Sequence, residues 1–536
     1  MHFNIADLFE SVCDAVPERD ACVSGSTRLS FAALEARANR LAHALEARGL
    51  GPNDHVGLHL YNGHQFVEAM IACFKIRAVP ININYRYVEH ELQYLCTNAD
   101  LKAVVTQREF LPLVAAVAPG VPTLHTILAV DDGTGAAIPA AGPDVLDYET
   151  ALRYAAPHRR FGARSGDDYY VIYTGGTTGM PRGVMWRQED VFFSALQGGA
   201  PGGDPITTPE ELAPIAASGD RLMAIIPAAP FIHGAAQFSA WIALFTGGKV
   251  VLSPGRSFDA DRIARLIEEE RVTTITIVGD AMALPLAGAL ERAVPPVDSS
   301  SLMAVASAGA VLSASVKERL QAQLPSTLIL NNFGASETGH QGSAFPTGDG
   351  ETKRLSFFMD DSNTVIGEDL RPLAPGSGLV GRLARRGRVP LAYYKDPEKS
   401  AQTFLTIGGE RWVVLRDLAT VELDGMITIF GREDACINTG GEKVFCEEVE
   451  EALKSHPAVH DAVVIGLPDE RWGNRVTAVV SPRDGTTPTL ADLDQHCRAL
   501  LAGYKVPREL HVVAAIHRQP SGKPDYPWAK RIAQGK

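Results

Sequence analysis

The chain lacks the cysteine patterns that mark secreted scaffolds and zinc sites. Its 7 cysteines are scattered over 536 residues, their number is odd, and no C-x-x-C pair occurs. Neither a disulfide framework nor a structural zinc site is therefore indicated. Because unpaired cysteines are typical of reducing compartments, we expect a cytoplasmic protein.

Long apolar runs and a surplus of basic residues are missing as well. No stretch approaches the roughly 18 apolar residues that mark a membrane span, so no transmembrane segment is expected. Residues 1–20 lack the basic start and apolar centre of a signal peptide. With 50 Lys and Arg against 63 Asp and Glu, the net charge is −13. A nucleic-acid partner is not expected, since proteins that bind nucleic acids usually present a basic face.

The composition that remains is that of a globular protein with more than one domain. Hydrophobic residues make up 46% of the chain and charged residues 21%. Residues 30–50 predict an amphipathic helix with Ser30 as its N-cap. Helix-like and strand-like segments then alternate, which indicates an α/β fold. Residues 197–214 are rich in Gly, Pro and Thr, and we expect them to form an exposed connection without chemistry.

A change of character near "FGREDACIN", residues 430–438, predicts a domain boundary. We expect a large N-terminal domain of layered mixed sheets and helices at 1–432, and a small α+β domain at 433–536. The small domain contains Lys523 in the turn "PSGKP". Gly and Pro on either side would present this lysine at the surface.

A glycine- and threonine-rich segment, "YTGGTTGMPRG" at residues 173–183, predicts a phosphate-binding loop. It follows the strand-like "DDYYVIY" and precedes "VMWRQEDVFFSAL", which we interpret as a helix. Glycines let backbone N–H groups converge on an anion, and Thr hydroxyls and Arg182 add donors. A mobile surface loop is the alternative. A Walker-type loop is excluded, because Met180-Pro181-Arg182 follows Gly179 where Lys-Ser/Thr would be needed.

Further motifs follow in a fixed order along the chain. They are "ASAGAVL" at 306–312, which suits a flat ring lying against backbone, "NNFGASETG" at 331–339, "LRDLA" with Asp417, "GRED" with Arg432, and finally the turn with Lys523. Over nearly the whole chain this order resembles the ANL superfamily of adenylate-forming enzymes. Within it, "NINYRYVEHELQYL" and "YYKDPEKSAQTF" look most like acyl-CoA synthetases, particularly the branch that acts on fatty acids and steroid side-chain acids.

The resemblance implies a two-step ligase reaction. A carboxylic acid would first be joined to AMP from ATP with Mg²⁺, releasing pyrophosphate, and coenzyme A would then displace AMP. The first step brings two anions together and needs cations and donors aimed at the α-phosphate. Lys523, Glu337, Ser336 and Thr174 would be catalytic, with Glu337 also holding the metal.

The resemblance assigns the other site residues in three groups. The acyl pocket would include His233, Gly339 and His340. The resemblance also implies that the small domain is mobile and rotates between the two steps. The hinge and the coenzyme A site would include Asp434, Gly440, Gly441 and Glu442. The nucleotide would be bound by Thr174, Gly175, Gly176, Thr177, Thr178, Gly179, Arg182, Ala308, Gly309, Ala310, Asn332, Phe333, Gly334, Asp417 and Arg432.

The chain departs from the family pattern at several of these positions. Gly175 stands where Ser is usual, Arg182 where Lys is usual, and Ser336 where Thr is common. Asp417 follows Leu415-Arg416 and not the usual Thr-Gly. The nucleotide loop retains its positive charge, but backbone geometry beside the ribose could differ.

Two other functions compete with this interpretation. An enzyme that adenylates amino acids would need an acid beside the substrate ammonium, and residues 227–241 contain no Asp or Glu; an adenylating enzyme for aryl acids stays open. A nucleotide-binding regulator without catalysis would be expected to lack Glu337 or Lys523, and both are present. A homodimer is compatible with the sequence, and the identity of the acid cannot be read from it.

Overall fold

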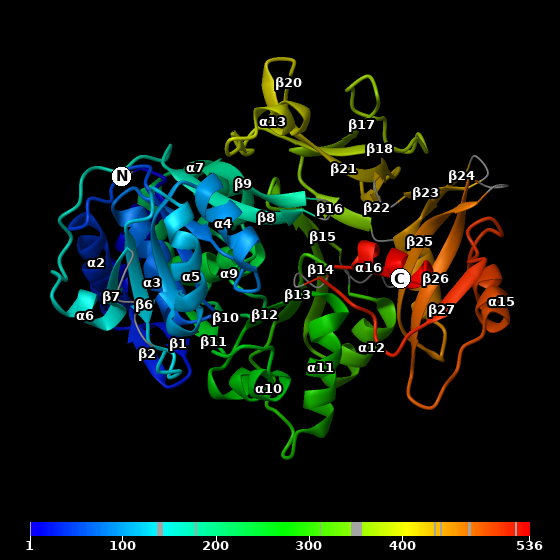
Figure 1. Ribbon diagram of the computed structural model, residues 1–536, viewed down its shortest axis with the longest axis horizontal. Helices are drawn as coiled ribbons and strands as arrows, with labels where there is room; N and C mark the ends of the chain where they lie inside the picture. Colours follow the sequence, from blue (N-terminus) through cyan, green and yellow to red (C-terminus); the bar gives the residue numbers. More distant parts are fainter. Residues whose placement is uncertain are drawn as a thin grey trace.

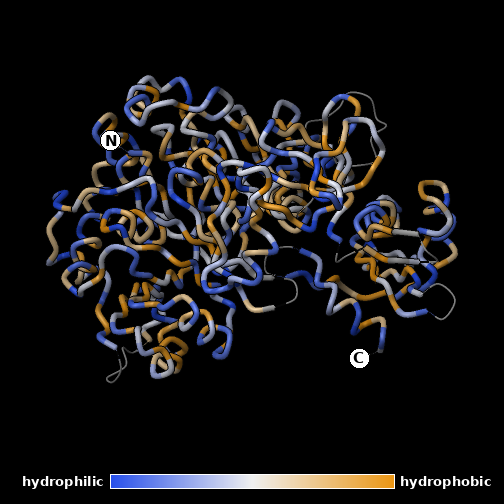
Figure 2. The backbone as a smooth tube through the Cα atoms, turned by 90° about the horizontal axis from the view of Figure 1, so that it is seen from above, coloured by the Kyte–Doolittle hydropathy of each residue, from blue (hydrophilic) through white to orange (hydrophobic). Residues whose placement is uncertain are grey.

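The computed structural model describes residues 2–136, 143–176, 179–310, 312–344, 356–433, 436–439, 442–469, 473–519 and 523–535. The chain forms a large body and a smaller C-terminal lobe, which contains the described residues of 436–535 (Figure 1). The view from above also shows this lobe beside the larger body (Figure 2). In the part of the chain that the structure describes, no helix has both the length and the apolar character needed to cross a bilayer.

The first sheet of the large body is parallel throughout. Its order is β4-β3-β5-β6-β7. Its strands are β3 (His55–His59), β4 (Val79–Asn82), β5 (Leu101–Gln107), β6 (Thr126–Val130) and β7 (Asp144–Asp147). The strands β3, β4 and β6 are buried along their whole length, as expected for parallel strands covered on both faces.

The second sheet is mixed and runs in the order β17-β18-β21-β22-β16-β15-β14-β13-β12-β10-β11-β1-β2, with β20 paired to β21. It is parallel from β14 to β1 and antiparallel from β14 to β17. Its strands are β1 (Asp20–Ser24), β2 (Thr27–Ser30), β10 (Ala224–Pro227), β11 (Lys249–Leu252), β12 (Thr274–Ile277), β13 (Ala304–Ser307), β14 (Leu328–Ala335), β15 (Gly339–Ala344), β16 (Ser356–Met359), β17 (Asn363–Ile366), β18 (Gly381–Arg386), β20 (Phe404–Ile407), β21 (Glu410–Val421) and β22 (Ile427–Arg432).

A third, antiparallel sheet joins β8 (Tyr169–Gly176), β9 (Gly179–Arg187) and β19 (Ala392–Tyr393). The helices of the large body are α1 (Ile5–Ala15), α2 (Phe31–Glu46), α3 (His64–Lys75), α4 (Glu89–Asn98), α5 (Leu111–Val117), α6 (Tyr148–Arg153), α7 (Gln188–Ala195), α8 (Leu212–Ser218), α9 (Gly234–Phe245), α10 (Ala260–Glu269), α11 (Gly279–Arg292), α12 (Ala314–Gln323) and α13 (Pro397–Thr403). Short 3-10 turns lie at η1 (Arg108–Phe110), η2 (Ala118–Gly120), η3 (Gln197–Gly199) and η4 (Pro209–Glu211).

The C-terminal lobe has an apolar core of its own, built mainly from valines of its sheet and the inner face of its first helix. Its elements are β23 (Cys436–Thr439), β24 (Glu442–Phe445), α14 (Cys446–Lys454), β25 (Val459–Asp469), β26 (Gly473–Pro482), α15 (Leu490–Leu500), β27 (Glu509–Val512) and α16 (Tyr526–Ala533). The predicted α/β class, with a large mixed-sheet part and a small α+β part, is confirmed.

Two local predictions need correction. The segment after the glycine-rich loop does not begin a helix, because Val184 to Arg187 continue β9, and α7 starts only at Gln188. Residues 197–214 are not simply exposed, since Gly198, Gly199 and Ile206 are buried. The helix expected at 30–50 is present as α2, and the Ser30 hydroxyl accepts the Ala33 N–H as its N-cap.

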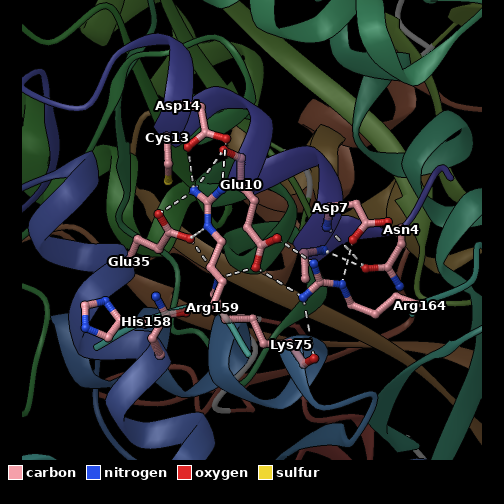
Figure 3. A network of polar contacts seen from close by, with 12 residues as sticks. Asn4, Asp7, Glu10, Cys13, Asp14, Glu35, Lys75, His158, Arg159 and Arg164 are labelled. Carbon is pink, nitrogen blue, oxygen red and sulfur yellow. Dashed lines mark hydrogen bonds and ion pairs between the residues drawn. The ribbon is translucent and has the colours of Figure 1, made fainter. Parts of the chain in front are cut away.

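Buried ion pairs fasten the N-terminal helices together (Figure 3). The Lys75 side chain is fully buried, and its Nζ donates to Glu10 Oε1 at 2.5 Å and Glu35 Oε1 at 2.9 Å. These residues lie on α3, α1 and α2, respectively, and Arg159 and Arg164 add further pairs from the segment before β8. Burial opposes ionisation of Glu10, but Lys75 and Arg164 outweigh it and hold the pKa of that carboxyl below its usual range.

This network makes Lys75 a sensitive position for stability. Lys75→Met should lower the free energy of unfolding by about 3–5 kcal/mol, because it leaves buried carboxylates short of a partner. Lys102→Met is the control. Lys102 is 41% exposed and pairs with Asp54, and losing such a surface pair should cost about 0–1 kcal/mol. Denaturant unfolding followed by tryptophan fluorescence measures both, and equal losses would contradict the role given to Lys75.

Candidate active site

The glycine-rich segment forms a β-hairpin between β8 and β9. Thr174 lies opposite Arg182 in the antiparallel register, and Gly176 lies opposite Gly179. Arg182 Nε donates to Asp396 Oδ2 at 2.8 Å, and Asp396 is also the N-cap of α13. Part of the charge that we expected to face phosphate is therefore shared with a carboxylate. Thr177 and Thr178 lie outside the described residues.

Glu337 lies in the tight turn between β14 and β15. Its Oε1 accepts a hydrogen bond from the Tyr393 hydroxyl at 2.9 Å. Burial and the neighbouring Glu337 both raise the pKa of Tyr393, so the phenol remains a donor at neutral pH. Tyr393 lies on β19, which pairs with β9 of the glycine-rich hairpin. This hydrogen bond therefore links the Glu337 side chain to the sheet that contains the glycine-rich hairpin.

Side chains from neighbouring strands donate hydrogen bonds to the backbone carbonyls of the Glu337 turn and hold it in place. The Arg385 guanidinium donates to the carbonyls of Thr338 and His340 at 2.5 and 2.6 Å, and Trp186 Nε1 donates to the Ser336 carbonyl at 2.8 Å. Gly339 has a φ of +68°, and a Cβ there would lie 2.6 Å from the Ser194 carbonyl oxygen. A glycine is needed at this position for both reasons.

The segments expected to bind the base meet at one edge of the second sheet. β13 ends at Ser307, which lies opposite Asn331 in the parallel register. Residues Ala308, Gly309 and Ala310 therefore leave β13 beside Asn332, Phe333 and Gly334 of the longer β14. Backbone at the carboxyl ends of parallel strands is where nucleotides bind in open α/β sheets. Gly309 has a φ of +81° and open space where a side chain would be.

Lys523 lies among the charged residues of the large body. Desolvation by the surrounding protein and the charge of Arg432 lower its pKa, while Glu337 and Asp417 act in the opposite direction. The residue as a whole remains solvent-accessible. A lysine from the C-terminal lobe thus shares one electrostatic environment with three predicted site residues of the large body.

Asp417 and Arg432 are paired across neighbouring strands. They lie opposite each other in the antiparallel register of β21 and β22. Burial raises the pKa of Asp417, and Arg432 and Lys523 counteract this rise. The structure therefore brings together Glu337, Asp417, Arg432 and Lys523, residues that are far apart in the sequence.

The two histidines expected in the acyl pocket are neutral at physiological pH. Burial, with smaller contributions from Lys523 and Arg86, lowers the pKa of His233 to about 4. Burial and Arg385 lower the pKa of His340 to about 4. His340 Nε2 lies 3.3 Å from Ser343 Oγ, which in turn donates to Asn332 Oδ1. Both side chains can serve as polar walls without adding charge.

The carboxylate of Glu337 is the metal ligand that the sequence predicts in this part of the chain. Among the residues that the structure describes, no group of three or more His, Cys, Asp or Glu side chains is placed to hold a metal ion. Glu337 is a single carboxylate with one oxygen in the Tyr393 hydrogen bond. This arrangement fits Mg²⁺ bound by one carboxylate together with phosphate oxygens.

The hinge and coenzyme A predictions are largely beyond the described part of the chain. Asp434, Gly440 and Gly441 lie outside it, and Glu442 is placed only as the first residue of β24. The sequence analysis missed Tyr393, Arg385 and Asp396. Of these, Tyr393 and Asp396 fall within the quoted "YYKDPEKSAQTF", while no sequence signal marked Arg385.

Comparison with known proteins identifies the family. The model of the AMP-binding enzyme family matches residues 9–393, and that of its C-terminal domain matches residues 448–523. The chain belongs to the AMP-binding enzyme family. The match to these models confirms the predicted superfamily. Together with relatives that are named CoA ligases, it also confirms the predicted class of AMP-forming acid–thiol ligase.

Three relatives align over almost their entire length. A 3-oxocholest-4-en-26-oate–CoA ligase from Rhodococcus rhodochrous is 47% identical, with 99% of this chain and 96% of the relative covered. A medium/long-chain-fatty-acid–CoA/3-oxocholest-4-en-26-oate–CoA ligase from Mycolicibacterium smegmatis is 45% identical, with 100% and 97% covered. The medium-chain acyl-CoA ligase Mig from Mycobacterium avium is 41% identical, with 99% and 98% covered.

Solved structures show the same fold. The anthranilate CoA ligase AuaEII in complex with anthranoyl-AMP superimposes with a TM-score of 0.83 at 22% identity, covering 100% of this chain and 98% of that one. ATP-bound MatB from Rhodopseudomonas palustris gives a TM-score of 0.82 at 24% identity, with both chains covered completely.

The Tyr393 hydrogen bond provides a test of the metal assignment. Tyr393→Phe should raise the Mg²⁺ concentration needed for half-maximal pyrophosphate release by about tenfold, because a hydrogen bond to a charged group contributes about 1.5–3 kcal/mol. Tyr394→Phe is the matched control, since the Tyr394 hydroxyl donates to Asp100 and not to the site. If both variants respond to Mg²⁺ like the wild type, Tyr393 does not position the metal ligand.

Proposed function

We propose that this enzyme activates an apolar carboxylic acid of medium length or longer, either a fatty acid or a steroid side-chain acid. ATP would supply the AMP of an acyl-adenylate, and coenzyme A would accept the acyl group. The observation that carries the proposal is the 47% and 45% identity, over nearly the full chain, to two ligases whose names include 3-oxocholest-4-en-26-oate.

The charges around Lys523 support the roles of the site residues. A lysine held between the carboxylates Glu337 and Asp417, with Arg432 nearby, can bind two anions and lower their repulsion. Lys523 would bridge the substrate carboxylate and the α-phosphate, and Asp417 would accept hydrogen bonds from the ribose hydroxyls. Glu337 would hold Mg²⁺, which when bound neutralises phosphate charge. Thr174, Ser336 and the glycine-rich hairpin would complete the phosphate site.

The walls of the acyl site favour an acid without a second charge. His233 and His340 are neutral because burial lowers the pKa of each to about 4. The helix α9 that follows His233 contains no acidic side chain that could pair with an ammonium. An apolar tail therefore fits these walls better than an amino acid does.

The proposed roles of the two parts are based on the position of Lys523 in the C-terminal lobe. We place the adenylate-forming domain at 1–432 and the mobile domain at 433–536, with the hinge near Asp434. Gly440, Gly441 and Glu442 would lie beside coenzyme A after the mobile domain rotates. The cytoplasmic location and the homodimer remain predictions from the sequence.

The substrate proposal is tested with a panel of acids in an assay of AMP release. Since each buried CH₂ contributes about 0.8 kcal/mol, kcat/KM should rise about fourfold per added methylene until the pocket is full. The steroid acid 3-oxocholest-4-en-26-oate is compared in the same assay with saturated acids from acetate to palmitate. A preference for acetate or for amino acids would contradict the proposal.

The role of Lys523 is tested by separating the two half-reactions. Lys523→Ala should abolish formation of the acyl-adenylate, but leave thioester formation from synthetic acyl-AMP and coenzyme A largely intact, because only the first step needs a cation at the α-phosphate. Lys530→Ala, an exposed lysine of the same lobe, is the control. Equal loss of both half-reactions in a folded Lys523→Ala protein would show that the lysine has no step-specific role.

A further inference from the structure

The orientation of the C-terminal lobe depends on contacts made by α14. Lys454, the last residue of this helix, lies 3.7 Å from Asp280 at the start of α11, measured from Nζ to Oδ2. Three residues earlier, Glu451 Oε1 accepts the backbone N–H of Ala314 at 3.2 Å, the first residue of α12. One helix of the lobe thus contacts the N-terminal ends of two helices of the large body.

Asp280 is held in place by the large body itself. Its Oδ1 accepts the backbone N–H of Ser313 at 2.8 Å, and its side chain is 19% exposed. The Lys454 side chain is only 12% exposed. Asp280, Glu451, Glu450 and Asp461 together raise the pKa of Lys454, although burial acts against this rise. The lysine therefore remains charged while it is enclosed between the two parts.

A continuous chain of contacts leads from this ion pair to Lys523. Glu450 of α14 accepts the Val464 N–H of β25. On the same strand, Asp461 accepts two hydrogen bonds from Arg518 at 2.6 and 2.9 Å. Arg518 is bridged to Pro524, and Gln519 N donates to the Lys523 carbonyl. A shift of α14 would therefore be transmitted to Lys523 and Pro524.

Packing between the two parts is incomplete beside this ion pair. A cavity of about 430 Å³ lies between the start of α11 and residues 517–519, and its lining includes Ala281, Met282, His517 and Gln519. Side chains do not interlock across this gap. Apolar contact between the two parts lies elsewhere, as in the stacked rings of Phe430 and Phe445, so the polar contacts of α14 add to what holds the lobe in this orientation.

We propose that Asp280 and Lys454 are positioning residues for the adenylation step, acting as a latch that holds α14, and through it Lys523, in the orientation seen here. The latch rests on the proposed role of Lys523 and on the proposed rotation of the C-terminal domain. When that domain rotates for the thioester step, the two residues separate. The latch therefore favours the first half-reaction and plays no part in the second.

The test uses the full-length enzyme and measures each half-reaction separately. Asp280→Asn keeps an oxygen acceptor for the Ser313 N–H, and Lys454→Met keeps the apolar stem of the lysine. Each variant should slow single-turnover pyrophosphate release about 5- to 20-fold, while thioester formation from synthetic acyl-AMP and coenzyme A stays at the wild-type rate or increases. Lys454→Arg should restore the first step, because it restores the charge.

A double variant and a surface control complete the design. Asp280→Asn combined with Lys454→Met should be no slower than either single variant, since both remove the same contact. Arg498→Gln, which breaks the exposed Arg498–Asp494 pair on α15, should leave both half-reactions unchanged. Thermal unfolding checks that every variant is folded.

The outcomes separate the latch from the proposed function. The latch is overturned if both half-reactions fall equally, if neither changes, or if the losses of the two single variants add in the double variant. Failure of the proposed function would instead appear as the absence of thioester formation from acyl-AMP in the wild type. It would also appear as an equal loss of both half-reactions in Lys523→Ala.

Discussion

The site depends on one electrostatic constraint. Lys523 of the C-terminal lobe has to stay positively charged in surroundings that contain two carboxylates and a guanidinium. Desolvation and Arg432 push the pKa of Lys523 down, and Glu337 and Asp417 push it up. The carboxylates would be engaged once a metal ion and a ribose are bound, which leaves the ammonium free to face the anions of the substrates. In the proposed mechanism the same carboxylates would therefore stabilise the charged lysine in the empty site and bind ligands in the occupied one.

Much of the architecture could be predicted because it is local. The helix α2 starts directly after Ser30, the predicted N-cap. The largely buried strand β5 coincides with an apolar run in the sequence. The sequence predicts a helix from Val184 because a helical pattern follows from Gln188 onward, but residues 184–187 continue β9. The alternation that marks a strand was present, since Val184 and Trp186 are buried while Met185 and Arg187 are half-buried.

Only the site residues that lie within sequence motifs could be predicted. Motif order named Glu337, Asp417, Arg432 and Lys523, and the structure brings them together. It could not reveal the partners that hold them, because those contacts join residues separated by long stretches of chain. Arg182 and Asp396 are 214 positions apart, and Tyr393 and Glu337 are 56 apart. Such pairs follow from sheet order, which the alternation of helices and strands does not specify.

The chemistry of the helix ends explains how a lobe can be positioned firmly and still be released. Asp280 lies in the first turn of α11 and Lys454 in the last turn of α14, where the helix dipole favours a negative and a positive charge, respectively. Each charge is therefore stabilised within its own part of the molecule, with or without its partner. Separating the two does not strand a charge in an apolar core, in contrast to the fully buried Lys75. A contact between opposed helix ends thus suits an interface that has to open in every catalytic cycle, whereas a buried ion pair suits one that stays closed.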